Sequence, residues 1–280
     1  MSVAPKGNDH KLSNNGTVWK PEPKNNAPTW EPKEHNYPPV LWQEMACLLI
    51  TYAVKKLQDK VGGKRCRSWL KKERCLNDHT IEKYNLGLLP SDCFRERLTW
   101  GLPNELKKET GKPKRLWFPR GLVIPIVSKG VVLRLRIRRP DPGEYSKYYI
   151  VPGSNMSPFY DENDASVAVI VESELDAILL SQELKNEALV IALGSVTNRP
   201  DKKLTDILRH SVDHILIALD TDNAGGKQCY DFWVKQFPKS SRCILPSKYG
   251  KDPTEAALNG LDLYKWFRVG LKIAKKRIKN

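Results

Sequence analysis

The chain has 280 residues, 40% of them hydrophobic, and a formal net charge of +15 at pH 7. This length allows one large domain or two small ones. The positive charge predicts a polyanionic partner, and we expect that partner to be nucleic acid. No apolar run reaches the roughly 18 residues of a membrane helix, and the amino terminus has no apolar signal core, so we expect a soluble, cytoplasmic protein without a membrane partner.

The cysteines are scattered along the chain, and no two of them form a C-x-x-C pair. The common zinc sites use such closely spaced ligands. We therefore expect reduced thiols and no bound zinc. The six positions are Cys47, Cys66, Cys75, Cys93, Cys229 and Cys243.

The first part of the chain changes character near residue 40. Residues 1–40 contain seven prolines and six asparagines, which predicts a disordered tail or linker. A helical apolar pattern follows over residues 41–60 and ends before Gly62-Gly63, and a strongly basic segment covers residues 64–74. Asn77 then has the properties of a helix N-cap and predicts a short helix after it.

Residues 115–150 have the pattern of strands. From Val131 to Arg139, apolar and basic residues alternate, which predicts a half-buried antiparallel strand with one cationic face. This face is expected to bind a nucleic-acid backbone together with other nearby cations, the alternative being a solvated charged surface above a core. The expected nucleic-acid-binding residues are Arg74, Arg134, Arg136, Arg138, Arg139 and Lys147.

From residue 166 onward, strand and helix patterns alternate. Strands are expected near residues 166–172, 188–194, 213–220 and 241–246, and helices near 174–185, 201–211, 224–237 and 253–260. Such alternation predicts an α/β domain with a parallel sheet and flanking helices. Residues 263–280 are rich in lysine and arginine and are expected to form a basic helix or tail.

Acidic residues follow three of these strands. Glu172 and Asp176 come after the first, Asp220 and Asp222 after the third, and Asp252 after the fourth. Because the carboxyl ends of parallel strands meet at one edge of the sheet, these acids should converge. Oxygen ligands of this kind suit Mg²⁺ together with substrate phosphates. The alternative is that the acids only cap helices, which is common for any one of them.

These motifs resemble the Toprim domain. The matching residues are Glu172-x-x-x-Asp176, Asp220-x-Asp222-x-x-Gly225 and Lys251-Asp252-Pro253. Upstream, residues 69–87, Phe118-Pro119 and the strand ending at Arg138-Arg139 resemble bacterial-type DNA primases, and the resemblance covers residues 65–260. It implies a basic, mixed α+β subdomain over residues 41–160 and a Toprim catalytic domain with a parallel sheet over residues 165–262.

The resemblance also assigns roles to residues. It implies that Glu172, Asp220 and Asp222 are catalytic and hold Mg²⁺ or Mn²⁺, and that Asp176 and Asp252 complete the metal site. Arg74, one of Arg138 or Arg139, and Lys147 would guide the template. Two residues depart from the family pattern: Ser173 replaces the usual glycine, and Thr254 replaces the usual second aspartate of the last motif.

The expected function is DNA-templated synthesis of short RNA primers from ribonucleoside triphosphates on a single-stranded DNA template. The zinc-binding module of primases is missing from this sequence and no helicase-docking domain is expected, so a phage or mobile element is the expected source, with those functions on a partner chain. Two alternatives remain open: a metal-dependent Toprim nuclease, and an inactive Toprim module that only binds nucleic acid.

Overall fold

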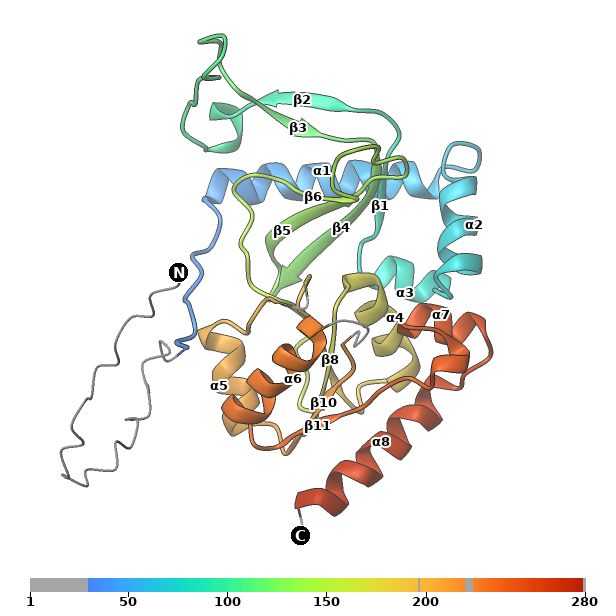
Figure 1. Cartoon of the computed structure of the whole chain (residues 1–280). Helices are drawn as coiled ribbons and strands as arrows, with labels where there is room; N and C mark the ends of the chain where they lie inside the picture. Colours follow the sequence, from blue (N-terminus) through green and yellow to red (C-terminus); the bar gives the residue numbers. More distant parts are fainter. Residues whose placement is uncertain (1–29, 196, 220–223, 279–280) are drawn as a thin grey trace, which may run out of the picture. The chain divides into compact units, whose positions relative to one another are not determined.

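The computed structural model describes residues 30–195, 197–219 and 224–278 (Figure 1). From Pro32 onward, the chain forms one compact unit. Among the described residues, no helix is long and apolar enough to span a bilayer. Asp220 and Asp222, two of the expected metal ligands, lie outside the described residues.

The first part of this unit packs a long helix on an antiparallel sheet. The sheet has the order β1 (Gly87–Leu89), β4 (Gly121–Ser128), β5 (Val131–Arg138), β6 (Tyr148–Ile150). Helix α1 (Val40–Gln58) buries one residue at nearly every turn, because its apolar residues recur at intervals of three or four. The buried residues of α1 are Trp42, Ala46, Ile50, Ala53 and Leu57.

Further elements surround this sheet. Helices α2 (Lys64–Glu73) and α3 (Asp78–Lys83) follow α1, and the side chain of Asn77 caps α3 by accepting a hydrogen bond from the Thr80 N–H, which confirms the predicted N-cap. Strands β2 (Cys93–Glu96) and β3 (Arg115–Phe118) form a separate antiparallel pair, with the short 3₁₀ helix η1 (Leu98–Trp100) between them. The predicted strands over residues 115–150 are confirmed, whereas β1 and β2 had not been expected.

Strand β5 contains a bulge that changes which residues face the core. Its pairing with β4 shifts between Ile126 and Val127, so that Leu133 is the extra residue. As a result Val132, and not Leu133, joins Leu135 and Ile137 in the core under α1. The arginines keep to the opposite face of the strand, as predicted, and the bulge determines where that face points.

The second part is the predicted α/β domain. Its sheet has the order β11 (Ser240–Arg242), β10 (His214–Ile217), β8 (Val167–Val171), β9 (Leu189–Ala192), β7 (Phe159–Tyr160). The first four strands are parallel, and β7 pairs antiparallel with β9 at the edge. The expected fold class is therefore confirmed, with one edge strand that the sequence pattern did not predict.

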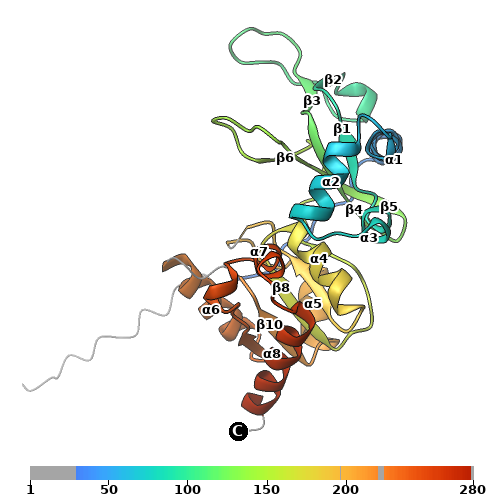
Figure 2. The ribbon, with the colours of Figure 1, turned by 90° about the vertical axis from the view of Figure 1, so that its right-hand side faces the viewer.

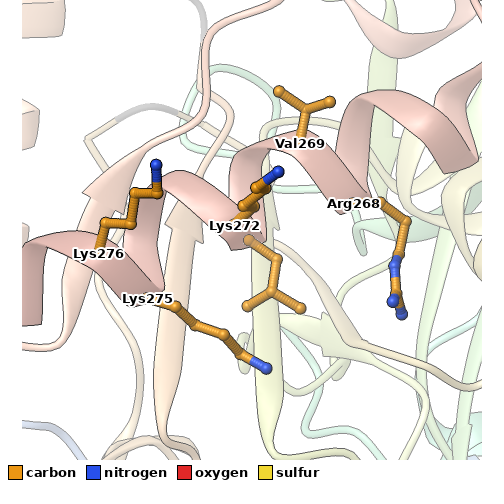
Figure 3. A pocket seen from close by; sticks show the side chains of 6 residues that line it. Arg268, Val269, Lys272, Lys275 and Lys276 are labelled. Carbon is orange, nitrogen blue, oxygen red and sulfur yellow. The ribbon is translucent and has the colours of Figure 1, made fainter.

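Helices cover both faces of this sheet (Figure 2). Right-handed crossovers place α4 (Glu174–Leu184) on one face and α5 (Lys202–His210) and α6 (Ala224–Gln236) on the other. Helix α7 (Pro253–Leu258), preceded by the 3₁₀ helix η2 (Ser247–Tyr249), lies beside α4, and the final helix α8 (Leu263–Ile278) packs on α4, β10 and β11. Basic side chains project from α8 on the side away from the sheet (Figure 3).

The residues just before α1 are held by this unit, although the sequence places them in the expected disordered tail. The Lys202 N–H donates to the carbonyl oxygen of Lys33 over 3.0 Å, and the amide of Asn155 donates to the carbonyl oxygen of Asn36 over 2.9 Å. These bonds satisfy backbone groups that a proline-rich segment could not pair within itself.

Candidate functional site

The acidic edge begins where β8 ends. Glu172 follows the strand directly and is half-buried, and Asp176 lies in the first turn of α4 and is buried. Asp252 caps α7 and accepts a hydrogen bond from the Glu255 N–H over 2.7 Å. Two of the three sequence clusters therefore meet at the carboxyl edge of the sheet, and the remaining one, Asp220 and Asp222, lies outside the described residues.

Asp176 is held by two hydroxyl groups. Ser173 donates to one carboxylate oxygen over 2.5 Å, and Thr254 donates to the other over 2.6 Å. Burial and the charge of Asp252 raise the pKa of Asp176, while the two hydroxyls lower it. Ser173 and Thr254 are the two residues that depart from the Toprim pattern, and both of them contact this one carboxylate.

Glu172 lies close enough to Asp176 for their charges to repel. Burial and then the charge of Asp176 raise the pKa of Glu172, and Arg136 opposes the shift. Acids gathered in this way favour a bound cation, and their hard oxygen atoms suit Mg²⁺ or Mn²⁺. Among the described residues, no group of three or more His, Cys, Asp or Glu side chains is by itself arranged to hold a metal ion. Glu172, Asp176 and Asp252 stay predicted ligands, which would need further acids to hold an ion.

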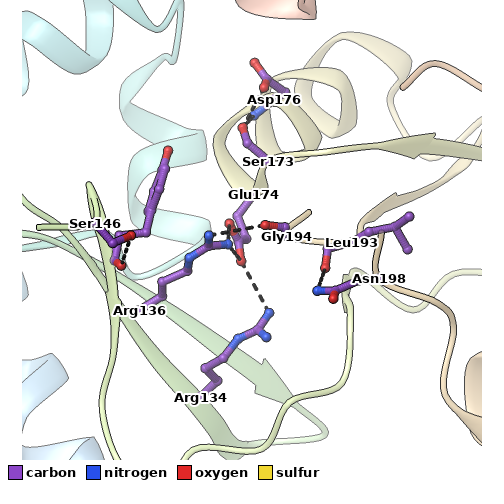
Figure 4. Close-up of polar contacts among 10 residues, drawn as sticks. Arg134, Arg136, Ser146, Ser173, Glu174, Asp176, Leu193, Gly194 and Asn198 are labelled. Carbon is purple, nitrogen blue, oxygen red and sulfur yellow. Dashed lines mark hydrogen bonds and ion pairs between the residues drawn. The ribbon is translucent and has the colours of Figure 1, made fainter. Parts of the chain in front are cut away.

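Beneath this edge, a buried carboxylate joins the two parts of the molecule (Figure 4). Glu174, at the start of α4, is fully buried and pairs with Arg134 and Arg136 of β5. The distance from Arg134 Nη2 to Glu174 Oε1 is 3.3 Å, and Arg136 also contacts the carbonyl oxygen of Gly194. Arg136 lies over the ring of Tyr148, 4.2 Å from its centroid.

These contacts correct the prediction that Arg134 and Arg136 bind nucleic acid. Their side chains are only 4% and 11% exposed, and each of them pairs with Glu174. Burial lowers the pKa of Arg134 to about 10, although Glu174 opposes the shift. Glu174 itself was not predicted as a site residue. The signal that could have indicated it is a third acid at the end of β8, facing a strand with an excess of arginine.

Three of the predicted cations remain beside the acidic edge. Arg74 and Arg138 lie on Trp69, with the guanidinium carbons 5.1 and 4.4 Å from the ring. Burial lowers the pKa of Lys147, and the charges of Arg138 and Arg74 lower it further, while Asp252 raises it. The charge of Arg74 also lowers the pKa of Asp176, so this cluster lies within electrostatic reach of the acids. We call Arg74, Arg138 and Lys147 the basic cluster.

Arg139 has a different environment from Arg138. It donates to the carbonyl oxygens of Ser146 and Pro142 over 3.1 and 2.8 Å, and it lies 5.3 Å from the ring centroids of Trp117 and Tyr145. It therefore supports the turn between β5 and β6. Of the two arginines between which the sequence could not choose, Arg138 is the one next to Arg74 and Lys147.

Comparison with known proteins bears on the fold of the chain and on the family of its second part. Residues 169–257 match a family model described as Toprim-like. A DnaG primase catalytic domain bound to single-stranded DNA is similar in structure, with 18% identity and a TM-score of 0.62 over 83% of this chain and 80% of that one. No match was found among curated protein sequences.

Two further solved structures show the same likeness. A DNA primase domain from Pseudomonas aeruginosa has 19% identity and a TM-score of 0.62 over 82% of this chain and 78% of that one. The RNA polymerase domain of Mycobacterium tuberculosis primase DnaG has 19% identity and a TM-score of 0.56 over 83% and 86% of the two chains. Residues 169–257 are therefore a Toprim-like domain, within a chain that has the fold of the DnaG primase catalytic domain.

Proposed function

We propose that this chain is a DNA primase of the DnaG type, which joins ribonucleoside triphosphates into short RNA primers on single-stranded DNA. The observation that carries the proposal is the juxtaposition of Glu172, Asp176 and Asp252 with the basic cluster. Carboxylates alone would repel a nucleotide, and cations alone would only bind it. The combination suits a reaction in which phosphates must be both bound and activated by a metal ion.

The proposed division of labour assigns metal binding to the acids and phosphate binding to the basic cluster. Glu172, with Asp220 and Asp222, would hold Mg²⁺ or Mn²⁺, which activates the attacking hydroxyl and neutralises charge on the leaving pyrophosphate. Arg74, Arg138 and Lys147 would bind phosphates of the template and the incoming nucleotide. Residues 41–160 would accordingly bind the template through the basic cluster, and residues 165–262 would supply the chemistry.

Asp176 has a supporting role in this scheme. Both of its carboxylate oxygens accept hydrogen bonds from hydroxyls, and Thr254 belongs to α7 while Asp176 belongs to α4. The carboxylate therefore ties together the two helix starts that present Glu172 and Asp252. We propose that Asp176 contributes to the metal site mainly by fixing this arrangement.

The test compares Glu172→Gln with the matched control Glu82→Gln, since Glu82 is exposed on α3. The proteins are incubated with single-stranded DNA, Mg²⁺ or Mn²⁺ and labelled nucleotides, and products are separated on gels. We expect Glu172→Gln to lose at least about 100-fold in primer synthesis, because even outer-shell changes at metal sites cost roughly 10–100-fold. It should also weaken Mn²⁺ binding measured by calorimetry, and the control should change neither.

The same incubation distinguishes the alternatives. New oligoribonucleotides indicate a primase, a cut template indicates a nuclease, and bound but unchanged DNA indicates a binding module. We also propose a phage or mobile element as the source and a partner chain that supplies zinc-module or helicase functions. Copurification of such a partner from the native host would test the second point directly.

A further inference from the structure

Helix α8 has one apolar face and one basic face. The apolar face is buried against α4, β10 and β11, and Gly270 lets the helix approach Cys243 so closely that a Cβ atom would overlap the sulfur. An amphipathic helix packed in this way has most of its apolar surface covered by the protein. Its buried residues are Leu263, Trp266, Phe267, Leu271 and Ala274.

The basic face lines an open groove of about 480 Å³ (Figure 3). Arg268 pairs with Glu187 over 3.0 Å, but Lys272, Lys275 and Lys276 take part in no ion pair among the residues that the structure describes. Spacings of three and four place these three lysines on one side of the helix. They are all exposed, and the exposed apolar residues Val269 and Ile273 lie beside them.

The far end of this face, at Lys275, lies toward the amino ends of the strands, whereas the acids lie at their carboxyl ends. Lys275 is close to His214, the first residue of β10, since its charge is among the causes that lower the pKa of His214, after burial. Glu172, in contrast, follows the carboxyl end of β8, which runs parallel to β10. A strand of five residues at roughly 3.3 Å each separates these two edges by about 15 Å.

We propose that Lys272, Lys275 and Lys276 form a second binding site for the backbone of single-stranded DNA, separate from the catalytic edge. A row of unpaired cations suits consecutive phosphates, and binding would release counterions. A lipid surface fits less well, because most of the apolar surface that would insert is already buried in the protein and only Val269 and Ile273 remain exposed beside the lysines. The inference rests on the proposed function only in taking single-stranded DNA as the polyanion that binds. It does not require that the chain makes RNA.

The test uses the full chain with Lys272→Gln, Lys275→Gln and Lys276→Gln combined. The matched control combines Lys107→Gln, Lys108→Gln and Lys112→Gln, which removes the same charge from exposed lysines between η1 and β3. Binding of labelled single strands of 8 and 30 nucleotides is measured by fluorescence anisotropy over a range of salt concentrations. For the 30-mer, we expect the α8 variant to reduce the slope of log affinity against log salt by about 2, at roughly 0.7 per phosphate. The 8-mer should bind as before, and the control should bind both strands like the wild type.

Three outcomes would overturn the proposal. The salt slope for the 30-mer could be unchanged in the α8 variant, or the control variant could show an equal reduction of the slope. In a parallel measurement with anionic vesicles, the α8 variant could lose vesicle binding and keep DNA binding. Primer synthesis by the same variants separates this proposal from the proposed function. Glu172→Gln should abolish synthesis but retain the full salt slope, whereas the α8 variant should retain synthesis on a short template. If the wild type makes no RNA and the slope still depends on α8, the second site stands and the proposed function fails.

Discussion

Asp176 shows how two departures from a family pattern can act together. Ser173 replaces a glycine and Thr254 replaces an aspartate, and each donates a hydrogen bond to the same buried carboxylate. An aspartate at position 254 would instead place a second negative charge against Asp176. Thr254 therefore reduces the negative charge of the acidic edge, and both hydroxyls donate hydrogen bonds to Asp176, as a buried carboxylate requires.

The role of Thr254 can be measured through stability. Burial raises the folded-state pKa of Asp176, so the native protein keeps this proton to a higher pH than the unfolded chain does, and ionisation costs stability as pH rises through that range. The Thr254 hydroxyl offsets this cost. We expect Thr254→Val to lower the free energy of unfolding by about 1.5–3 kcal/mol at pH 8 and by less at pH 4.

The control is Thr254→Ser, which keeps the hydroxyl and removes only a methyl group. Urea denaturation of both variants at the two pH values, with EDTA present, measures the difference. Equal losses for Val and Ser, or a loss that does not depend on pH, would contradict a hydrogen bond to an ionised carboxylate.

At the scale of elements, local patterns in the sequence predicted most of the fold. The N-cap at Asn77, the strand–helix alternation after residue 166 and the basic final helix all depend on periodicity or capping chemistry within a few residues. Strands β1 and β2 escaped prediction because they are short and β2 is mostly exposed, which leaves no alternation to detect. The bulge at Leu133 follows from pairing with β4, which a single strand's pattern does not contain.

The candidate site was predictable to a different extent. Acids that follow strands of a parallel sheet share an edge, so the sequence predicted that Glu172, Asp176 and Asp252 lie near one another, and their role as metal ligands stays a prediction. Alternation in β5 predicted a cationic face but not what covers it. The covering group, Glu174, lies about 40 residues further along the chain in another element. For this reason, Arg134 and Arg136 were taken for surface residues, while Arg138, beyond the reach of Glu174, kept its predicted place.

The close packing of α8 against Cys243 leads to a separate prediction. Because a Cβ atom at Gly270 would overlap the Cys243 sulfur, Gly270→Ala should push α8 away from β11. We expect a loss of about 1–3 kcal/mol in the free energy of unfolding, typical of overpacking. Cys243→Ala in the same protein should restore part of the loss, since it removes the overlapping atom. If the double variant is no more stable than the sum of the single changes predicts, the two residues are not in contact.

At the scale of the whole unit, two features join the basic subdomain to the Toprim-like domain. A single apolar cluster includes Leu57 and Leu70 from the first part and Val169 and Leu175 from the second. The ion group of Glu174, Arg134 and Arg136 lies at the same junction. Apolar contacts are nondirectional, so the ion group is the feature that can fix how β5 faces the start of α4, and with it how the basic cluster faces Glu172.

Breaking this ion group should separate its contribution to stability from its contribution to geometry. Glu174→Gln leaves two buried guanidinium groups without a counter-charge, and we expect a loss of about 3–5 kcal/mol in the free energy of unfolding. Asp78→Asn is the control, since the Lys71–Asp78 pair is exposed and its loss should cost less than about 1 kcal/mol. Replacing Arg134, Glu174 and Arg136 together by Met removes every charge of this ion group and should recover most of the stability.

Synthesis should not recover in that triple variant. Arg136 lies close enough to Glu172 to lower its pKa, and it reaches the carbonyl oxygen of Gly194 at the end of β9. Without it, we expect the pKa of Glu172 to rise, so primer synthesis should fall and its pH dependence should move to higher pH. A triple variant that is stable and keeps the wild-type rate and pH profile would show that the ion group only holds the two parts together and does not position the acidic edge.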